Sequence, residues 1–385
     1  MFTLRQYLYT LLEPRGLTRT LGEIDLCRDA QGRPLYSSGN SAAVFRILHR
    51  GRIRALRCFL RPMPHLREIY GERLLEGELY LYTTPETGVW TDVVLDDWIE
   101  GISLRQAIGE AARGRERHRL ATLAEAFDRL ACDLVSDDRA HGDLKPENIL
   151  VATDGTLRPI DFDASFLPAF AGERSPELGT AGYQHPARTA ADFDASLDDY
   201  PAALISTALH ALSLDPTLYD RYGERDGLLF WPHRIAKDPA LHEVLALFES
   251  TCRAIPYRIA RLLLSPHLRL PELPGLLRRQ ITPAAMPCEP PELFGAEGRW
   301  GFRTPEHTVI PPLYDCAFEF TEGLAAVRLG RTWHYIDPSG RPVIHCPECE
   351  AVKPFRNGRA VVIRHGLRSE IDRSGAPTPP VSKKI

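Results

Sequence analysis

The pattern of hydrophobic and polar positions changes character along the chain. Two short runs near the amino terminus, residues 43–47 and 53–59, have the apolar and β-branched composition of strands. Residues 120–137 instead place apolar side chains at helical spacing, which predicts an amphipathic helix. A shorter amphipathic helix is predicted at the start of the chain, ended by Pro14 and Gly16. Toward the carboxyl terminus short alternating strands return, so we expect two domains of different class.

A proline-rich stretch separates these two parts of the chain. Residues 271–298 contain six prolines and few helical periods, which predicts a linker. The predicted organisation is a helical extension at 1–33, a main domain at 34–270, the linker at 271–297, an all-β domain at 298–376 and a tail at 377–385. A chain ended near Met286 is therefore expected to fold without the second domain.

The second domain repeats itself at an offset of 35 residues. The residues that recur are Phe320, Gly323, Ala325 and Val327, which return as Phe355, Gly358, Ala360 and Val362, and Ile336, Asp337, Ser339 and Gly340, which return as Ile371, Asp372, Ser374 and Gly375. A third copy begins upstream at Gly298. One unit supplies too few strands to bury its apolar face alone, so neighbouring units are expected to stack.

These units resemble the WG repeat family of bacterial proteins, on the dipeptide Trp300-Gly301 of the first copy. The dipeptide is lost at His334 and again at Ser369-Glu370. An atypical final unit suits a capping repeat. The resemblance implies that this domain binds a protein substrate or partner.

Composition adds limits on partners and location. The 385 residues are 44% hydrophobic and carry a net charge of -4, which gives no general attraction to nucleic acid or membrane. No apolar run is long enough to span a bilayer, and eight cysteines are widely scattered. We expect reduced thiols and a cytoplasmic protein. Cys346 and Cys349 lack a second ligand pair for zinc and are interpreted as strand and turn residues.

The densest chemistry lies in HGDLKPENIL, residues 141–150, where Asp143, Lys145 and Asn148 precede an apolar run. Asp161 follows 18 positions after Asp143, at the end of another short strand. Upstream, small residues at 37–42 join two strands, and such a turn lets backbone amides approach phosphate oxygens.

This order of motifs resembles the protein-kinase fold over residues 34–264. The resemblance implies an α+β, two-lobed architecture with a small β-rich N-lobe and a mainly helical C-lobe, followed by the small all-β repeat domain. It implies ATP and Mg²⁺ as cofactors. Asp198 resembles the buried aspartate that ties the following helix to the catalytic loop.

The resemblance also implies residue roles. Asp143 accepts or orients the proton of the attacking hydroxyl, Lys145 neutralises the transferred phosphoryl group, and Asn148 and Asp161 hold magnesium. One of the glutamates Glu68, Glu72 and Glu76 is expected to form an ion pair with Arg57, and Glu72 is preferred. The residues expected to contact the nucleotide are Gly39, Asn40, Ser41, Ala42, Val44, Ala55, Arg57, Glu72, Trp98 and Glu100.

Three departures from the kinase pattern bear on activity. Arg57 stands where the family has lysine, Gly142 replaces the arginine before Asp143, and Asp163 replaces the glycine after Phe162. The preferred interpretation is a serine/threonine protein kinase, because the Lys145 position belongs to that signature. The alternatives are a small-molecule kinase of the aminoglycoside or choline kinase type, and a nucleotide-binding pseudokinase scaffold.

Overall fold

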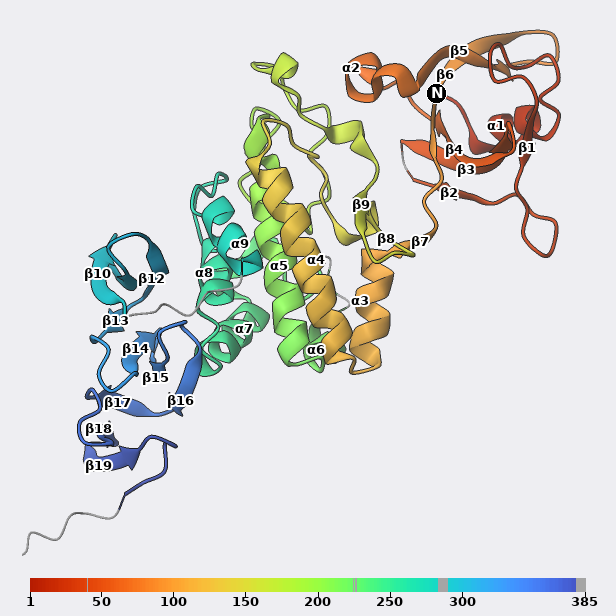
Figure 1. The fold of residues 1–385 in the computed structure, drawn as a ribbon. Helices are drawn as coiled ribbons and strands as arrows, with labels where there is room; N and C mark the ends of the chain where they lie inside the picture. Colours follow the sequence, from red (N-terminus) through yellow and green to blue (C-terminus); the bar gives the residue numbers. More distant parts are fainter. Residues whose placement is uncertain (40, 224, 226, 283–289, 379–385) are drawn as a thin grey trace, which may run out of the picture.

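A computed structural model describes residues 1–39, 41–223, 225, 227–282 and 290–378. Three units follow one another along the chain, as Figure 1 shows: a β-rich unit in red and orange, a helical unit in yellow to green, and a row of small sheets in blue. The helical unit lies between the other two. The architecture is therefore mixed α and β with an all-β carboxyl-terminal region.

The β-rich unit is one antiparallel sheet in the order β1-β3-β4-β6-β5, with β2 paired to β3. Its strands are β1 (Ile24–Leu26), β2 (Tyr36–Ser38), β3 (Ala42–His49), β4 (Arg52–Phe59), β5 (Leu74–Tyr82) and β6 (Gly88–Asp97). Alternation along β3 sends Ala43, Phe45 and Ile47, all fully buried, to one face. Helix α1 (Leu4–Leu12) covers this face and contributes the buried Tyr7.

The predicted helical extension at 1–33 is wrong beyond its first part. Helix α1 ends at Leu12, and β1 forms the edge of the main sheet by pairing with β3. Thr3 begins the helix, because its side chain and that of Gln6 form a reciprocal capping box. These first residues belong to the β-rich unit.

The helical unit is built around two long helices. Its elements are α3 (Leu104–Arg113), α4 (Arg117–Ser136), α5 (Asp199–Leu214), α6 (Leu218–Tyr222), α7 (Pro239–Ser250), α8 (Ala254–Leu262) and α9 (Leu273–Ile281), with the small sheet β7 (Gly101–Ser103), β8 (Ile149–Ala152) and β9 (Leu157–Pro159). The amphipathic pattern at 120–137 correctly predicted α4. Helix α5 is buried along nearly its whole length and packs against α4, as expected for a helix that is apolar on all sides.

The predicted linker at 271–297 is wrong in two places. Leu273–Ile281 forms helix α9, which packs against α4 through the fully buried Leu273 and Leu277. The first strand of the next unit already begins at Glu292. Met286, the proposed end of a shortened chain, lies outside the described residues.

The repeat region consists of three small antiparallel sheets. They contain β10 (Glu292–Ala296), β11 (Arg299–Arg303) and β12 (Thr308–Tyr314); β13 (Cys316–Ala317), β14 (Ala325–Leu329), β15 (Thr332–Ile336) and β16 (Pro342–Cys346); and β17 (Cys349–Val352), β18 (Arg359–Arg364) and β19 (Leu367–Asp372). Neighbouring sheets bury each other's apolar residues. The ring of Phe355 lies 4.8 Å from that of Tyr335 in the preceding sheet, which agrees with the expected stacking.

The first two sheets share their core with the helical unit. Phe302, Leu313 and Val327 belong to the same buried cluster as the long helices. Arg258 of α8 is 5% exposed and bridges the interface, where it binds Asp315 at 2.8 Å. The expectation that the first 286 residues form a self-sufficient domain therefore conflicts with this packing.

Within the described part of the chain, no helix is both long and apolar enough to cross a membrane. The short helix α2 (Leu66–Tyr70) lies where the β-rich unit approaches the helical unit.

Candidate functional site

The loop that follows α4 contains one position, Gly142, where the backbone accepts only glycine. Gly142 has a φ of 79°, and a Cβ atom there would lie 2.1 Å from the carbonyl oxygen of Ala164. Both the left-handed conformation and the contact exclude a side chain. The glycine that departs from the kinase pattern is therefore required by this fold.

Asp198 anchors the same loop through hydrogen bonds to its backbone. It is fully buried at the start of α5, and it accepts hydrogen bonds from the backbone N–H groups of His141 at 2.6 Å and Gly142 at 3.0 Å. Burial raises the pKa of this carboxyl group, while His141 and the two N–H donors oppose the rise. The predicted tie between Asp198 and the loop is confirmed by these bonds.

The ring of His141 fixes the direction of the chain on both sides. Its Nε2 lies 2.8 Å from the carbonyl oxygen of Ile160, and its Nδ1 lies 3.3 Å from the backbone nitrogen of Asp143. Since the backbone N–H donates, Nδ1 is the acceptor and Nε2 carries the proton. His141 thus links the backbone of Ile160, the residue before Asp161, to the backbone of Asp143.

The carboxylate of Asp143 is half-enclosed by donors. Lys145 Nζ lies 2.8 Å and Asn148 Nδ2 3.1 Å from Oδ2, and the N–H of Thr180 donates to Oδ1 at 2.6 Å. Three donors fix one rotamer of the carboxylate. The structure thus brings together three of the four predicted catalytic residues.

Thr180 is a site residue that the sequence reasoning missed. Its hydroxyl accepts a hydrogen bond from Lys145 Nζ at 2.7 Å, in addition to its backbone contact with Asp143. Gly179, with a φ of 68°, allows this approach, because a Cβ atom there would lie 2.8 Å from the carbonyl oxygen of Gly142. The signal available in the sequence was the pair Gly179-Thr180, in which a glycine stands directly before a hydroxyl side chain three residues ahead of Tyr183.

Asp161, the fourth predicted catalytic residue, follows a residue that is hydrogen-bonded to the backbone of Asn148. The backbone N–H of Ile160 donates to the carbonyl oxygen of Asn148 at 2.8 Å, so the two segments run side by side. Asp161 adopts a left-handed conformation with a φ of 69°, which aspartate tolerates better than most side chains. Its side chain is 36% exposed and forms an ion pair with Arg57.

Arg57 reaches this loop from strand β4 of the β-rich unit. Its side chain is 12% exposed and binds both Asp161 and the 4% exposed Asp163. Although burial lowers the pKa of the guanidinium, Tyr70, Asp161 and Asp163 together raise it above its usual range. One buried cation therefore joins the two units at the candidate site.

Tyr70 completes this network from the end of α2. Its hydroxyl donates to Asp163 Oδ1 at 2.6 Å, and burial raises the pKa of the phenol well above its usual range. Neither Tyr70 nor Asp163 had been given a role as a partner of Arg57. Their burial and their contacts identify them as the groups that hold Arg57 in place.

The prediction that Glu72 braces Arg57 is wrong. Glu72 is exposed in a single helical turn after Gly71, and Glu76 pairs with Arg67 on the surface. Helix α2 has five residues and ends at Gly71, whose φ is 54°. The helix is too short to present a glutamate to the interior, and Asp163 takes that position instead.

The predicted nucleotide-contacting residues of the sheet share one face. In the β3–β4 pair Val44 lies opposite Arg57 and Arg46 opposite Ala55, so all four side chains project to the side away from α1. Ala42 begins β3, and Ser41 directly precedes the strand. Asn40 lies outside the described residues.

The segment between the two units lies at the same edge. Arg46 forms an ion pair with Glu100, and its guanidinium lies 5.4 Å from the ring centroid of Trp98. The N–H of Gly39 donates to the carbonyl oxygen of Ala42 at 2.9 Å, which closes the small-residue turn. These residues therefore border the face that carries Arg57.

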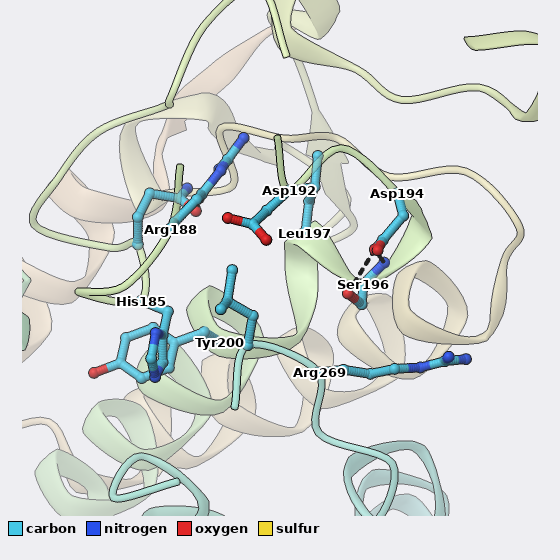
Figure 2. A pocket seen from close by; sticks show the side chains of 10 residues that line it. His185, Arg188, Asp192, Asp194, Ser196, Leu197, Tyr200 and Arg269 are labelled. Carbon is cyan, nitrogen blue, oxygen red and sulfur yellow. Dashed lines mark hydrogen bonds between the residues drawn. The ribbon is translucent and has the colours of Figure 1, made fainter. Parts of the chain in front are cut away.

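A cavity of about 100 Å³ lies between residues 184–200 and residues 268–269. Figure 2 shows His185 and Tyr200 against each other in this cavity, with ring centroids 5.1 Å apart. Arg188, also in its lining, donates to the carbonyl oxygen of Gly142 at 2.9 Å, and burial lowers the pKa of its guanidinium. This cavity is too small for a nucleotide, and its residues support the loop from behind.

The donor set of the site suits a hard cation. Asp161 supplies a carboxylate, and Asn148 donates its amide N–H to Asp143, which leaves the amide oxygen available. Magnesium takes one or two protein oxygens and completes its shell with phosphate and water. Among the described residues, no cluster of three histidine, cysteine or acidic side chains suits a metal.

Comparison with known proteins identifies the repeats. Residues 306–333 and 335–367 match the family described as WG containing repeat. No curated protein matches the chain. The match confirms the predicted repeats in the carboxyl-terminal region and covers less than half of the chain.

Proposed function

We propose that the chain is an ATP-dependent phosphotransferase with a two-lobed, protein-kinase-like body, of the serine/threonine kinase type. The β-rich unit is its N-lobe and the helical unit its C-lobe. The observation that carries the proposal is the carboxylate of Asp143, which is held by Lys145, Asn148 and Thr180 beside Asp161. A carboxylate oriented by charged and amide donors at the junction of two units suits transfer to a hydroxyl group.

The proposed roles follow from where each group lies. Asp143 Oδ2 accepts or orients the proton of the substrate hydroxyl, and Lys145, 2.8 Å from it, compensates negative charge that develops nearby. Asn148 and Asp161 hold magnesium, which when bound neutralises the ATP phosphates. Arg57 orients Asp161 and presents its remaining N–H donors toward the face that carries Val44 and Ala55.

A nucleotide-binding scaffold without turnover is the second candidate. The observation in its favour is the ion pair of Arg57 with Asp161, because a cation must share or displace that carboxylate. Arginine is a planar fork that does not substitute freely for lysine at such a site. The two candidates differ in turnover and not in nucleotide binding.

Transfer of labelled phosphate from γ-labelled ATP tests the proposal. The full chain is incubated with magnesium, a mixture of serine- and threonine-containing peptides, and separately with aminoglycosides and choline. Asp143→Asn is expected to lower transfer roughly a hundredfold or more, while Asp154→Asn on an exposed turn leaves it unchanged. ATP binding without any transfer in the parent chain favours the scaffold, and transfer only to the small molecules favours that kinase class.

A further inference from the structure

A crevice of about 600 Å³ lies where the helical unit meets the first repeats. Helices α4, α5, α8 and α9 supply one side, and β12 with the turn between β15 and β16 supplies the other. The two sides are fixed to each other by the shared core and by the ion pair of the buried Arg258 with the partly exposed Asp315. The crevice is therefore preformed by the packing of the two units.

The inner surface of the crevice is largely apolar. Val309 and Pro311 of β12 line it and stay partly exposed, whereas Ile310, Leu313 and Tyr314 of the same strand are almost fully buried. Ile255 of α8 adds partly exposed apolar surface on the helical side. Such a surface binds apolar side chains by removing them from water.

One buried carboxylate lies at the bottom, and its partners come from the protein. Asp128 is 1% exposed and accepts from Ser206 Oγ at 2.7 Å and from Gln280 Nε2 at 2.6 Å, with His210 Nε2 at 2.7 Å. Three polar neighbours satisfy this carboxylate within the fold. It therefore contributes little to what a ligand meets at the opening.

The opening carries an excess of positive charge. Arg253, Arg279 and Arg341 line the crevice, are exposed, and form no ion pair with any described residue. Other arginines of the same interface do have acidic partners, as Arg258 does in Asp315. Glu125 is the one exposed carboxylate in the lining, so the three guanidinium groups outweigh it.

We propose that this crevice binds an extended, acidic segment of a partner protein that also carries apolar side chains. Exposed guanidinium groups from three separate segments suit carboxylates spaced along a chain, and the partly exposed apolar residues Ile255, Val309 and Pro311 suit the side chains between them. Both the helical unit and the repeats contribute to recognition. The proposal is independent of the phosphotransferase activity.

Fluorescence anisotropy of a labelled synthetic peptide of alternating glutamate and leucine residues, titrated with the full chain at low ionic strength, tests this site. The double substitution Arg279→Gln with Arg341→Gln is expected to weaken binding about tenfold. Glu125→Gln is expected to tighten binding, because it removes a like charge. The matched control Arg368→Gln, an exposed arginine on the last strand, is expected to change nothing.

Several outcomes overturn the proposal. These are no binding of the peptide at low salt, equal binding of a lysine-leucine peptide, and equal loss of binding in Arg368→Gln and the double variant. Displacement of the peptide by inorganic phosphate at millimolar concentration assigns the crevice to a small anion instead. Asp143→Asn is expected to bind the peptide like the parent chain, which separates this test from the proposed catalysis.

Discussion

Replacing Arg57 by methionine tests the network that joins the two units at the candidate site. The substitution keeps the length and much of the apolar stem of the side chain but removes its charge. Asp163, 4% exposed, then retains only the hydrogen bond from Tyr70, whereas the 36% exposed side chain of Asp161 reaches water.

The magnitude follows from the buried carboxylate. Removing one partner of a buried ion pair costs about 3–5 kcal/mol, because the remaining charge is left without compensation. Adding Asp163→Asn to Arg57→Met removes that charge while the amide oxygen still accepts from Tyr70. The double variant is therefore expected to recover about 2 kcal/mol of the loss, a coupling typical of contacting residues.

Urea unfolding followed by circular dichroism measures these changes in the free energy of unfolding. Arg54→Met is the control on the same strand, because the side chain of its partner Asp97 is 85% exposed. An exposed pair is worth at most about 1 kcal/mol. If Arg57→Met costs no more than Arg54→Met, or if the double variant is the least stable of all, the assignment of a buried charge network is wrong.

Three further predictions concern the loop and the repeats. Gly142→Ala places a Cβ atom 2.1 Å from the oxygen of Ala164, so it is expected to cost clearly more than the ~1 kcal/mol of Gly155→Ala, where φ is 82° and nothing lies within 4 Å; equal melting temperatures contradict this. Asp198→Ala leaves two buried N–H groups without acceptors at about 1–3 kcal/mol each, and a loss below 1 kcal/mol in urea unfolding refutes the anchor role. Burial, with His345 nearby, lowers the pKa of His334 to about 4, so the unfolded chain binds the proton first, and stability is expected to fall by up to about 3 kcal/mol as the pH drops from about 6.5 to about 4. His334→Asn should flatten that slope, and an unchanged slope contradicts the assignment.

The sequence predicted those parts of the fold that show a regular spacing of side chains. The helical spacing at 120–137 predicted α4, and the repeat offset of 35 residues predicted stacked small sheets. In the dense motif at 141–150, the side chains of Lys145 and Asn148 both contact Asp143. Short-range spacing was sufficient for these features.

Long-range packing explains what the pattern did not predict. Proline content suggested a linker, yet Pro274 stands in the first turn of α9, where the missing N–H costs nothing. The preference for Glu72 assumed a longer helix than Gly71 permits. His334, where the repeat dipeptide is lost, lies 2.8 Å from the carbonyl oxygen of Glu249 in α7, a contact between residues far apart in sequence that no local pattern contains.

The most direct test of the proposed phosphotransferase is a thermal-shift titration of the full chain with ATP, with and without magnesium. The proposal predicts that ATP raises the melting temperature only when magnesium is present, with stabilisation of about 2.7 kcal/mol at a hundred times the dissociation constant. Asp161→Asn is expected to stay folded, because Arg57 keeps its ion pair with Asp163, and to lose the magnesium-dependent shift. No shift with ATP, or the same shift in Asp161→Asn as in the parent chain, contradicts the proposed site.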